Sequence, residues 1–276
     1  MKKDTSTTRV INRNNPLYKA YKAGEMVTFK DNGNRSHKVP QPWDETRTRC
    51  SYSNGKTGIP SISFLAGDSG KEYSGSFPAV LKPLFKGVTG TCGADCPGCY
   101  AKAITRNIEP AIKYALNTIE MKQDPERFIA LVEKELFTGN PLQSPRVVRL
   151  HDSGEIYSVE YWRAVLGMIS RHPETIFGTY TKAADVVTAC GISKEETPAN
   201  LSISCSPWIT ADGETLCAPI ADLPQFIYDD GTNPETASLP HCPAVDKNGH
   251  RTGVTCSKCL HCYTAKRGDR WAVYAH

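Results

Sequence analysis

Two short groups of cysteines constrain this chain more than any other feature of its sequence. Seven of the eleven cysteines belong to these groups, and the other four stand alone: Cys50, Cys190, Cys205 and Cys217. The first group is Cys92, Cys96 and Cys99; the second group is Cys242, Cys256, Cys259 and Cys262. Isolated cysteines are usually small buried residues, whereas cysteines spaced this closely indicate metal ligands.

The sequence leads us to expect that these cysteines lie in a reducing compartment. The chain has a formal charge of +4, and no apolar run is long enough for a transmembrane helix. The basic N-terminus lacks the apolar stretch of a secretory signal, so we expect a cytoplasmic protein with no membrane partner. Disulfides are uncommon in that compartment, which strengthens the case for metal binding.

The first cysteine group lies in the loop sequence CGADCPGCYA, with gaps of three and two residues. Structural zinc nearly always has four protein ligands, whereas three cysteines on an iron–sulfur cubane leave one iron open. Glycines and Pro97 keep the loop tight, so that backbone amides can approach the sulfurs. We therefore predict a [4Fe-4S] cluster here. Two alternatives stay open, namely a zinc loop with a distant fourth ligand such as Cys50 or a histidine, and unbound cysteines.

The second cysteine group has gaps of thirteen, two and two residues, which is similar to ferredoxin-type spacing. Three closely spaced cysteines would crowd a tetrahedral zinc, so a second [4Fe-4S] cluster is favoured. Zinc is the alternative, and a histidine would then replace one thiolate: His241, His250 or His261.

Hydrophobic periodicity predicts alternating strands and helices after an irregular N-terminal arm. We expect helices from 108, from 124 to 137, after Ser158, and over 183–190. We expect strands at 59–65, 146–151, 176–180, 200–205 and 215–220. Such alternation is typical of parallel βαβ units. We predict an α/β fold with a partial or complete TIM-like β/α barrel, or alternatively an open doubly wound sheet. The expected domains are an arm over 1–58, a barrel core over 59–225, and a cysteine-rich extension over 226–276.

The spacing of the first cysteine group, ahead of helices and a βα repeat, resembles the radical S-adenosylmethionine (SAM) superfamily. In that superfamily three cysteines bind a [4Fe-4S] cluster, SAM chelates the fourth iron, and reductive cleavage of SAM generates a 5′-deoxyadenosyl radical. The CPGCYA loop and the RxHxSG segment ending at Gly154 also resemble an uncharacterised phage-associated family.

The resemblance implies further site residues. Ser153, Gly154 and Glu155, the Ser-Gly-Glu segment, take the place of a Gly-Gly-Glu motif that binds the SAM amino group. Many members of the superfamily have an aromatic residue just before the third cysteine. In this chain the aromatic residue, Tyr100, follows that cysteine instead. By analogy, residues after later strands could contact the SAM carboxylate or ribose: Lys182, Ser202, Ser204 and Ser206. Cys205 could donate a hydrogen atom to a substrate radical.

These features predict a radical SAM-type enzyme that needs an external electron donor. Its substrate stays open between nucleotide, nucleic acid, peptide and small metabolite. One alternative is a nucleic-acid-binding protein with structural iron–sulfur or zinc sites, although the low net charge argues mildly against it. Another is an iron–sulfur protein without SAM chemistry.

Overall fold

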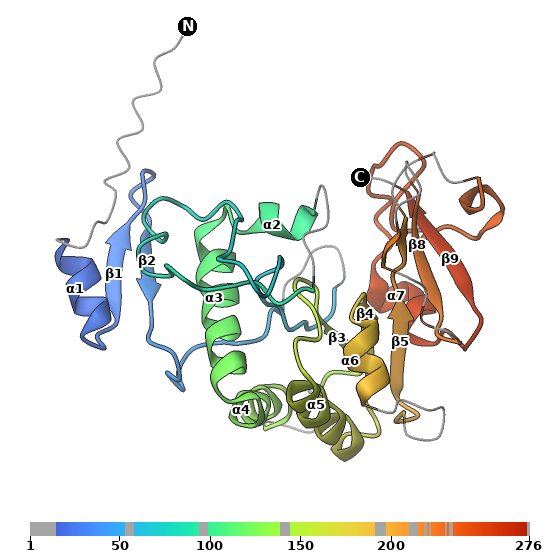
Figure 1. The fold of residues 1–276 in the computed structure, drawn as a ribbon, viewed down its shortest axis with the longest axis horizontal. Helices are drawn as coiled ribbons and strands as arrows, with labels where there is room; N and C mark the ends of the chain where they lie inside the picture. Colours follow the sequence, from blue (N-terminus) through green and yellow to red (C-terminus); the bar gives the residue numbers. More distant parts are fainter. Residues whose placement is uncertain are drawn as a thin grey trace, which may run out of the picture.

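The computed structural model describes residues 15–52, 58–93, 99–138, 144–190, 197–209, 215–217, 220, 222–229, 231 and 234–274. Its helices are α1 (Pro16–Lys22), α2 (Tyr100–Ile104), α3 (Ile108–Gln123), α4 (Pro125–Phe137), α5 (Val159–Arg171), α6 (Ala184–Ala189) and α7 (Cys256–Cys259), with the 3-10 turns η2 (Thr236–Ser238) and η3 (His261–Tyr263). Its strands are β1 (Val27–Lys30), β2 (Ser36–Val39), β3 (Val147–Leu150), β4 (Ile176–Thr181), β5 (Leu201–Cys205), β6 (Trp208–Ile209), β7 (Thr215–Cys217), β8 (Gln225–Asp229) and β9 (Arg270–Tyr274). Figure 1 shows their arrangement.

The predicted helices are confirmed, and local capping explains where two of them start. The side chain of Asp124 accepts a hydrogen bond from Arg127 N at 2.9 Å, and a proline opens α4. The side chain of Ser158 accepts from Tyr161 N at 3.2 Å at the start of α5. Each cap satisfies a backbone N–H that has no partner within the helix.

A five-stranded parallel sheet in the order β3-β4-β5-β8-β9 forms the centre of the fold. The predicted strand over 59–65 is not a regular strand, but it runs parallel to β3. Ile62 N donates to Arg149 O at 3.1 Å, and Arg149 N donates to Pro60 O at 2.9 Å. The α/β prediction is confirmed, and the segment before the first cysteine group lies at the β3 edge of the sheet.

The sheet continues beyond the predicted core, and one strand prediction needs correction. Residues 226–276, predicted as a cysteine-rich extension, contribute β9, which pairs with β8 in the parallel sheet. The pairing of β8 with β9 is hard to see in the sequence, because a long connection that contains the second cysteine group separates the two strands. The strand predicted at 215–220 forms as β7, but it pairs antiparallel with β6 in a separate hairpin.

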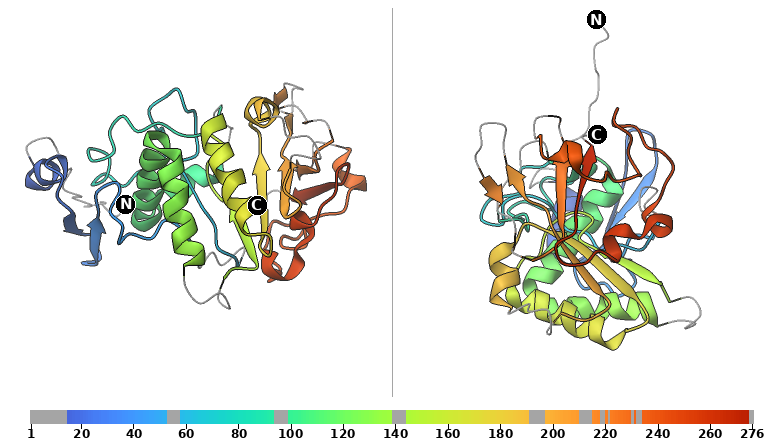
Figure 2. Two further views of the ribbon diagram at one scale, coloured as in Figure 1. Left: turned by 90° about the horizontal axis from the view of Figure 1, so that it is seen from below. Right: turned by 90° about the vertical axis from the view of Figure 1, so that its right-hand side faces the viewer.

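Helices cover one face of the sheet. Figures 1 and 2 show α4, α5 and α6 side by side along it, and their apolar residues share a core with alternate residues of β3 to β5. The opposite face, called here the polar face, carries Arg149, Gly178, Tyr180, Ser202 and Ser204, which are cross-strand neighbours. The strand pairing of the described residues runs from β3 to β9 without closing into a ring.

The N-terminal arm is more regular than predicted. Helix α1 and the antiparallel hairpin β1–β2 pack through Tyr21, Val27, Phe29 and Val39 against α3 and the loop around Phe85. The apolar residues of such a short hairpin are too few to show a clear period in the sequence. Residues 1–14 lie outside the described part of the chain.

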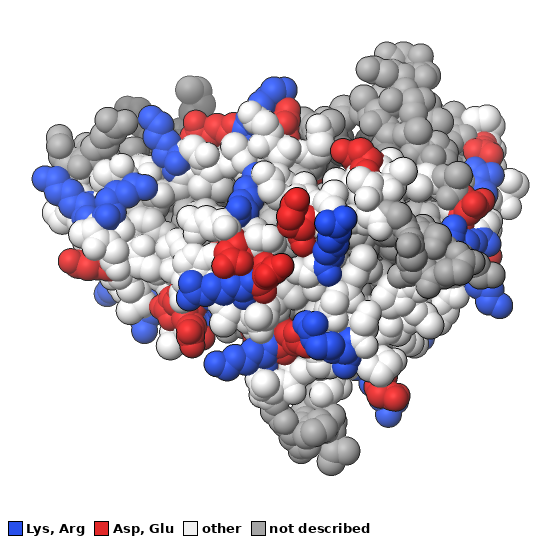
Figure 3. Space-filling view, turned by 60° about the horizontal axis from the view of Figure 1, so that its bottom comes forward, with Lys and Arg blue, Asp and Glu red and all other residues white. Residues whose placement is uncertain are grey.

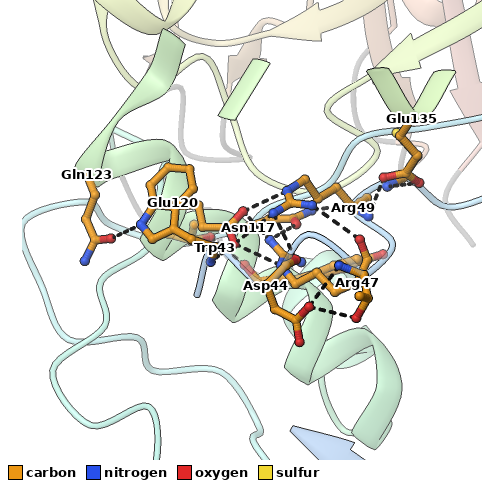
Figure 4. A network of polar contacts seen from close by, with 12 residues as sticks. Trp43, Asp44, Arg47, Arg49, Asn117, Glu120, Gln123 and Glu135 are labelled. Atoms are coloured by element: carbon orange, nitrogen blue, oxygen red, sulfur yellow. Dashed lines mark hydrogen bonds and ion pairs between the residues drawn. The ribbon is translucent and has the colours of Figure 1, made fainter. Parts of the chain in front are cut away.

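A buried ionic network joins the segment after the hairpin to α3 (Figure 4). Glu120 of α3 is fully buried and accepts from Arg47 Nη2 at 2.6 Å and Arg49 Nε at 2.9 Å. Trp43 N also donates to the Glu120 carboxylate, at 2.5 Å. Because both partners of each pair are buried, the network fixes residues 43–50 on the helix.

None of the helices in the described ranges is both long enough and apolar enough to cross a membrane.

Candidate functional site

The loop that leads into the first cysteine group meets the Ser-Gly-Glu segment at the carboxyl edge of the sheet. Thr91 lies one residue before Cys92, and its hydroxyl accepts a hydrogen bond from Glu155 N at 3.0 Å. The same hydroxyl donates to Leu65 O at 3.0 Å. Thr91 therefore joins three segments: the end of 59–65, the cysteine loop, and the turn after β3.

Gly154 is required at this junction for two reasons. Its φ of +85° is in the left-handed region, and a Cβ there would lie 2.7 Å from both Phe64 Cβ and Thr91 Oγ1. The carbonyl and hydroxyl of Ser153 are also committed to the fold: Ser153 O accepts from Phe64 N at 2.8 Å, and Ser153 Oγ donates to Phe64 O at 2.8 Å. The Ser-Gly-Glu segment is thus a tight structural turn that places the backbone of Glu155 beside the cysteine loop.

Glu155 connects the ends of β3 and β4. Its carboxylate Oε1 accepts from Thr181 Oγ1 at 2.7 Å and from Ile156 N at 2.8 Å, and Oε2 accepts from Lys182 N at 2.8 Å. Burial raises the pKa of Glu155, and these hydrogen bonds oppose the rise by favouring the ionised form. With four lone-pair directions and three donors, the carboxylate can accept one more hydrogen bond.

The first and third cysteines of the first group stand at the two ends of their loop. Gly67 N–H donates to Cys92 Sγ at 3.4 Å, and Cys92 N donates back to Gly67 O at 2.8 Å. Cys99 is the N-cap residue of α2. Both side chains are partly exposed. A backbone N–H pointing at sulfur favours the thiolate form, which is the form that binds metals. Cys96 and the side chain of Tyr100 lie outside the described part of the structure.

Of the other predicted site residues, Lys182 and Ser204 lie at or near the site, whereas Cys205 points away from it. Lys182 is near the site: its Nζ donates to Ser206 Oγ at 3.4 Å, linking the ends of β4 and β5. Ser204 lies on the polar face and is 1% exposed, with no hydrogen-bond partner for its hydroxyl among the described residues. Cys205 points the other way, into the core beneath the helices, where it is fully buried and accepts from Ile220 N at 3.3 Å. The structure therefore does not bring the Cys205 thiol to the site.

The second cysteine group covers the polar face. Ser202 Oγ donates to Cys262 O at 2.9 Å, and the ring of Tyr263 lies so close to Gly178 that a Cβ there would be 2.4 Å from it. The pKa of the Cys262 thiol is raised to about 12, chiefly by burial and in part by the nearby thiols of Cys242 and Cys256. Cys259 is exposed at the end of α7. Three of the four thiols are thus neighbours on this face.

Across the described ranges, no three Cys, His, Asp or Glu side chains already stand in positions to share one metal ion. Three thiols of the second group are therefore close together without the geometry to share one metal ion, and Cys96 of the first group lies outside the described residues.

Lys122 and Thr91 were not predicted from the sequence. Lys122 of α3 donates to Gly90 O at 2.6 Å and to Thr89 Oγ1, and its Nζ lies 4.4 Å from the ring centre of Tyr157. Burial lowers its pKa to about 8. One signal was present: Lys122 continues the apolar stripe of α3, three residues after Ile119, so a buried lysine could have been suspected.

A family comparison adds to this geometry. Residues 65–265 match the model of the family described as gene product 88. The chain belongs to the gene product 88 family. No curated protein and no solved structure matches this chain. The prediction of a phage-associated family is thereby confirmed, whereas the radical SAM resemblance stays a prediction.

All seven cysteines of the two groups and the Ser-Gly-Glu segment fall inside the gene product 88 region. Helix α1 and the β1–β2 hairpin lie before it, and β9 lies after it.

Proposed function

We propose that this protein is an iron–sulfur enzyme of radical SAM type, with a [4Fe-4S] cluster on Cys92, Cys96 and Cys99. The observation that carries the proposal is the hydrogen bond from Glu155 N to Thr91. It joins the turn after β3 to the residue before the first cysteine, at the edge of a parallel sheet where ligands commonly bind. A three-cysteine loop beside a Ser-Gly-Glu turn is the pairing that the superfamily resemblance requires.

The residues present fit such a cluster chemically. Two of the three thiols are partly exposed at the loop ends, and Gly67 N–H already points at Cys92 sulfur. When bound, the cluster would supply an electron for the reductive cleavage of SAM, with an external donor to reduce it. The chain's own contribution is to hold the loop against the sheet through Thr91 and Lys122.

The polar face supports a bound polar ligand next to the loop. Three buried hydroxyls on it have no hydrogen-bond partner among the described residues: Ser61, Ser63 and Ser204. Burying an unpaired hydroxyl is costly, so a ligand or water is expected to pair with them. We assign the SAM amino group to Glu155, and the carboxylate or ribose to Lys182 and Ser204.

The remaining assignments follow from the same proposal. Helices on one face and a buried polar opposite face suit a partial β/α barrel better than a doubly wound sheet, which needs helices on both faces. We assign a second [4Fe-4S] cluster to Cys242, Cys256, Cys259 and Cys262, with zinc as the alternative. Nucleotides and nucleic acids are the candidate substrates, and the proposed location is the cytoplasm.

The test is to purify the protein without oxygen, quantify iron, sulfide and zinc, and then add dithionite and SAM. Two clusters of about four irons each and formation of 5′-deoxyadenosine are expected. Zinc without sulfide would overturn the proposal in favour of structural metal sites. Iron and sulfide without SAM cleavage would leave an iron–sulfur protein of another class.

Cysteine variants locate each metal. Cys92→Ala should abolish SAM cleavage and lower the iron content by about half, since one of two four-iron clusters would be lost. Cys190→Ala is the matched control, because Cys190 is partly buried like Cys92 but belongs to neither group.

A further inference from the structure

The low net charge of the chain conceals a strong asymmetry. Residues 1–39 carry nine Lys or Arg against three Asp or Glu, a formal charge of +6. The remaining residues carry 24 Lys or Arg against 26 Asp or Glu. The positive charge of the protein is therefore concentrated at its N-terminal end.

The hairpin presents part of this charge on a single face. Burial alternates along both strands, so that Val27, Phe29, His37 and Val39 point inward. The outward residues are exposed: Thr28, Lys30, Ser36 and Lys38. Thr28 pairs with Lys38 and Lys30 pairs with Ser36, so the two lysines are diagonal neighbours on one surface.

Three further exposed cations lie on the adjoining elements: Lys19 and Lys22 of α1, which contacts β1, and Arg35 in the hairpin turn. We call the five cations and the outward hairpin face the basic surface. In Figure 3, blue side chains gather at the end of the molecule that α1, β1 and β2 form in Figure 1, whereas blue and red alternate over the rest of this view.

The acids near the basic surface pair with His37 and Arg35 and not with its lysines. Asp31 Oδ2 lies 3.1 Å from His37 Nε2 and 3.3 Å from Arg35 Nε, and Glu109 Oε1 lies 2.6 Å from His37 Nδ1. Glu25, in the connection between α1 and β1, is the other acid of this region. Lys30 and Lys38 make no ion pair with any residue in the described ranges.

The basic surface is held firmly on the protein. The inward side of the hairpin packs on α3 and on the loop around Phe85, and Glu109 of α3 binds His37 of β2. The basic surface also lies outside the region matched by the gene product 88 model, which begins at residue 65. Whatever the shared region does, this surface is an addition to it.

We propose that the basic surface binds the phosphate backbone of nucleic acid. Lysine and arginine on a flat strand face, with threonine and serine hydroxyls between them, provide the charge and hydrogen-bond donors that phosphates need. A lipid surface fits less well, because membrane-binding elements insert apolar side chains. Met26 is the one large apolar side chain strongly exposed near the basic surface in the described part of the chain. This proposal does not rest on either metal site.

The experiment measures fluorescence anisotropy of a short labelled DNA duplex with the full chain, at several salt concentrations. The affinity should fall steeply with salt, and Lys30→Glu with Lys38→Glu should make the slope of log K against log salt about 2 units shallower. At low salt the double variant should bind at least about tenfold more weakly. Thermal unfolding checks that the variant is folded.

The matched control is Lys134→Glu with Lys247→Glu, which changes the net charge equally at exposed lysines elsewhere. The proposal is wrong if both double variants lose affinity equally, because net charge alone would then explain binding. It is also wrong if the native chain does not bind DNA, or binds only phosphatidylserine-rich vesicles in a sedimentation assay. Because SAM cleavage is not measured, failure here is distinct from failure of the proposed function.

Discussion

Glu155 N donates a hydrogen bond to Thr91 Oγ1 over 3.0 Å, which joins the turn after β3 to the residue preceding Cys92. These two residues are far apart in the sequence and belong to different motifs. Their contact is what turns two separate sequence patterns into one candidate site.

Thr91→Val should test this contact, because valine keeps the shape and loses the hydroxyl. Glu155 N and Leu65 O would each lose a buried partner, so we expect the free energy of unfolding to fall by about 1–3 kcal/mol. Urea unfolding measures the loss. Thr28→Val is the control at an exposed position and should change stability by less than about 0.5 kcal/mol. Equal effects would show that the Thr91 hydroxyl does not hold the turn.

Gly154→Ala should destabilise the protein more than Gly253→Ala. Both glycines have a φ of +85°, so both variants carry the left-handed penalty of about 1–2 kcal/mol. Only Gly154 is crowded, by Phe64 and Thr91, and we expect about 1–3 kcal/mol more from overpacking. Equal losses in chemical denaturation would contradict the close approach described here.

Lys122 should make stability rise with pH in the alkaline range. Burial lowers its pKa from 10.5 to about 8 in the folded protein, so the unfolded chain binds more protons between these values. The stability of the native chain relative to Lys122→Met should therefore increase from about pH 8 to 10.5 and be level below that range. Lys134→Met, at an exposed position, is the control and should show no such trend. A flat difference for Lys122→Met would rule out a buried lysine.

The ionic network around Glu120 should contribute far more to the free energy of unfolding than an exposed ion pair does. Glu120→Gln leaves the buried Arg47 and Arg49 without a charged partner, and we expect a loss of about 3–5 kcal/mol. Glu133→Gln makes the same chemical change beside Arg171, which is 57% exposed, and should cost less than about 1 kcal/mol. Differential scanning calorimetry can compare the two, and similar costs would contradict the burial of the network.

Much of the helical part of the fold was predictable because its signals are local. Asp124 and Ser158 cap helices whose apolar residues recur regularly, so α4 and α5 begin where the sequence indicates. Strands β8 and β9 were not predicted as partners, because pairing between distant segments leaves no local pattern. Glu120 was likewise missed, since a charged residue in a helix is usually exposed and its partners lie more than 70 residues earlier.

In the candidate site, too, local motifs were predictable and contacts between distant segments were not. The cysteine spacing and the Ser-Gly-Glu turn were visible in the sequence, but their contact through Thr91 depends on how 59–65 pairs with β3. The orientation of Cys205 toward the helix-covered core was not predictable, because strand alternation alone does not say which face of a sheet the helices cover.

Electron paramagnetic resonance tests the central claim most directly. The sample is the reduced protein purified without oxygen, with Cys256, Cys259 and Cys262 changed to Ala so that one predicted cluster is left. The account predicts a [4Fe-4S] spectrum that changes when SAM is added and that disappears when Cys92 is also changed to Ala. A spectrum that SAM leaves unchanged, or a protein that contains no iron, would contradict it.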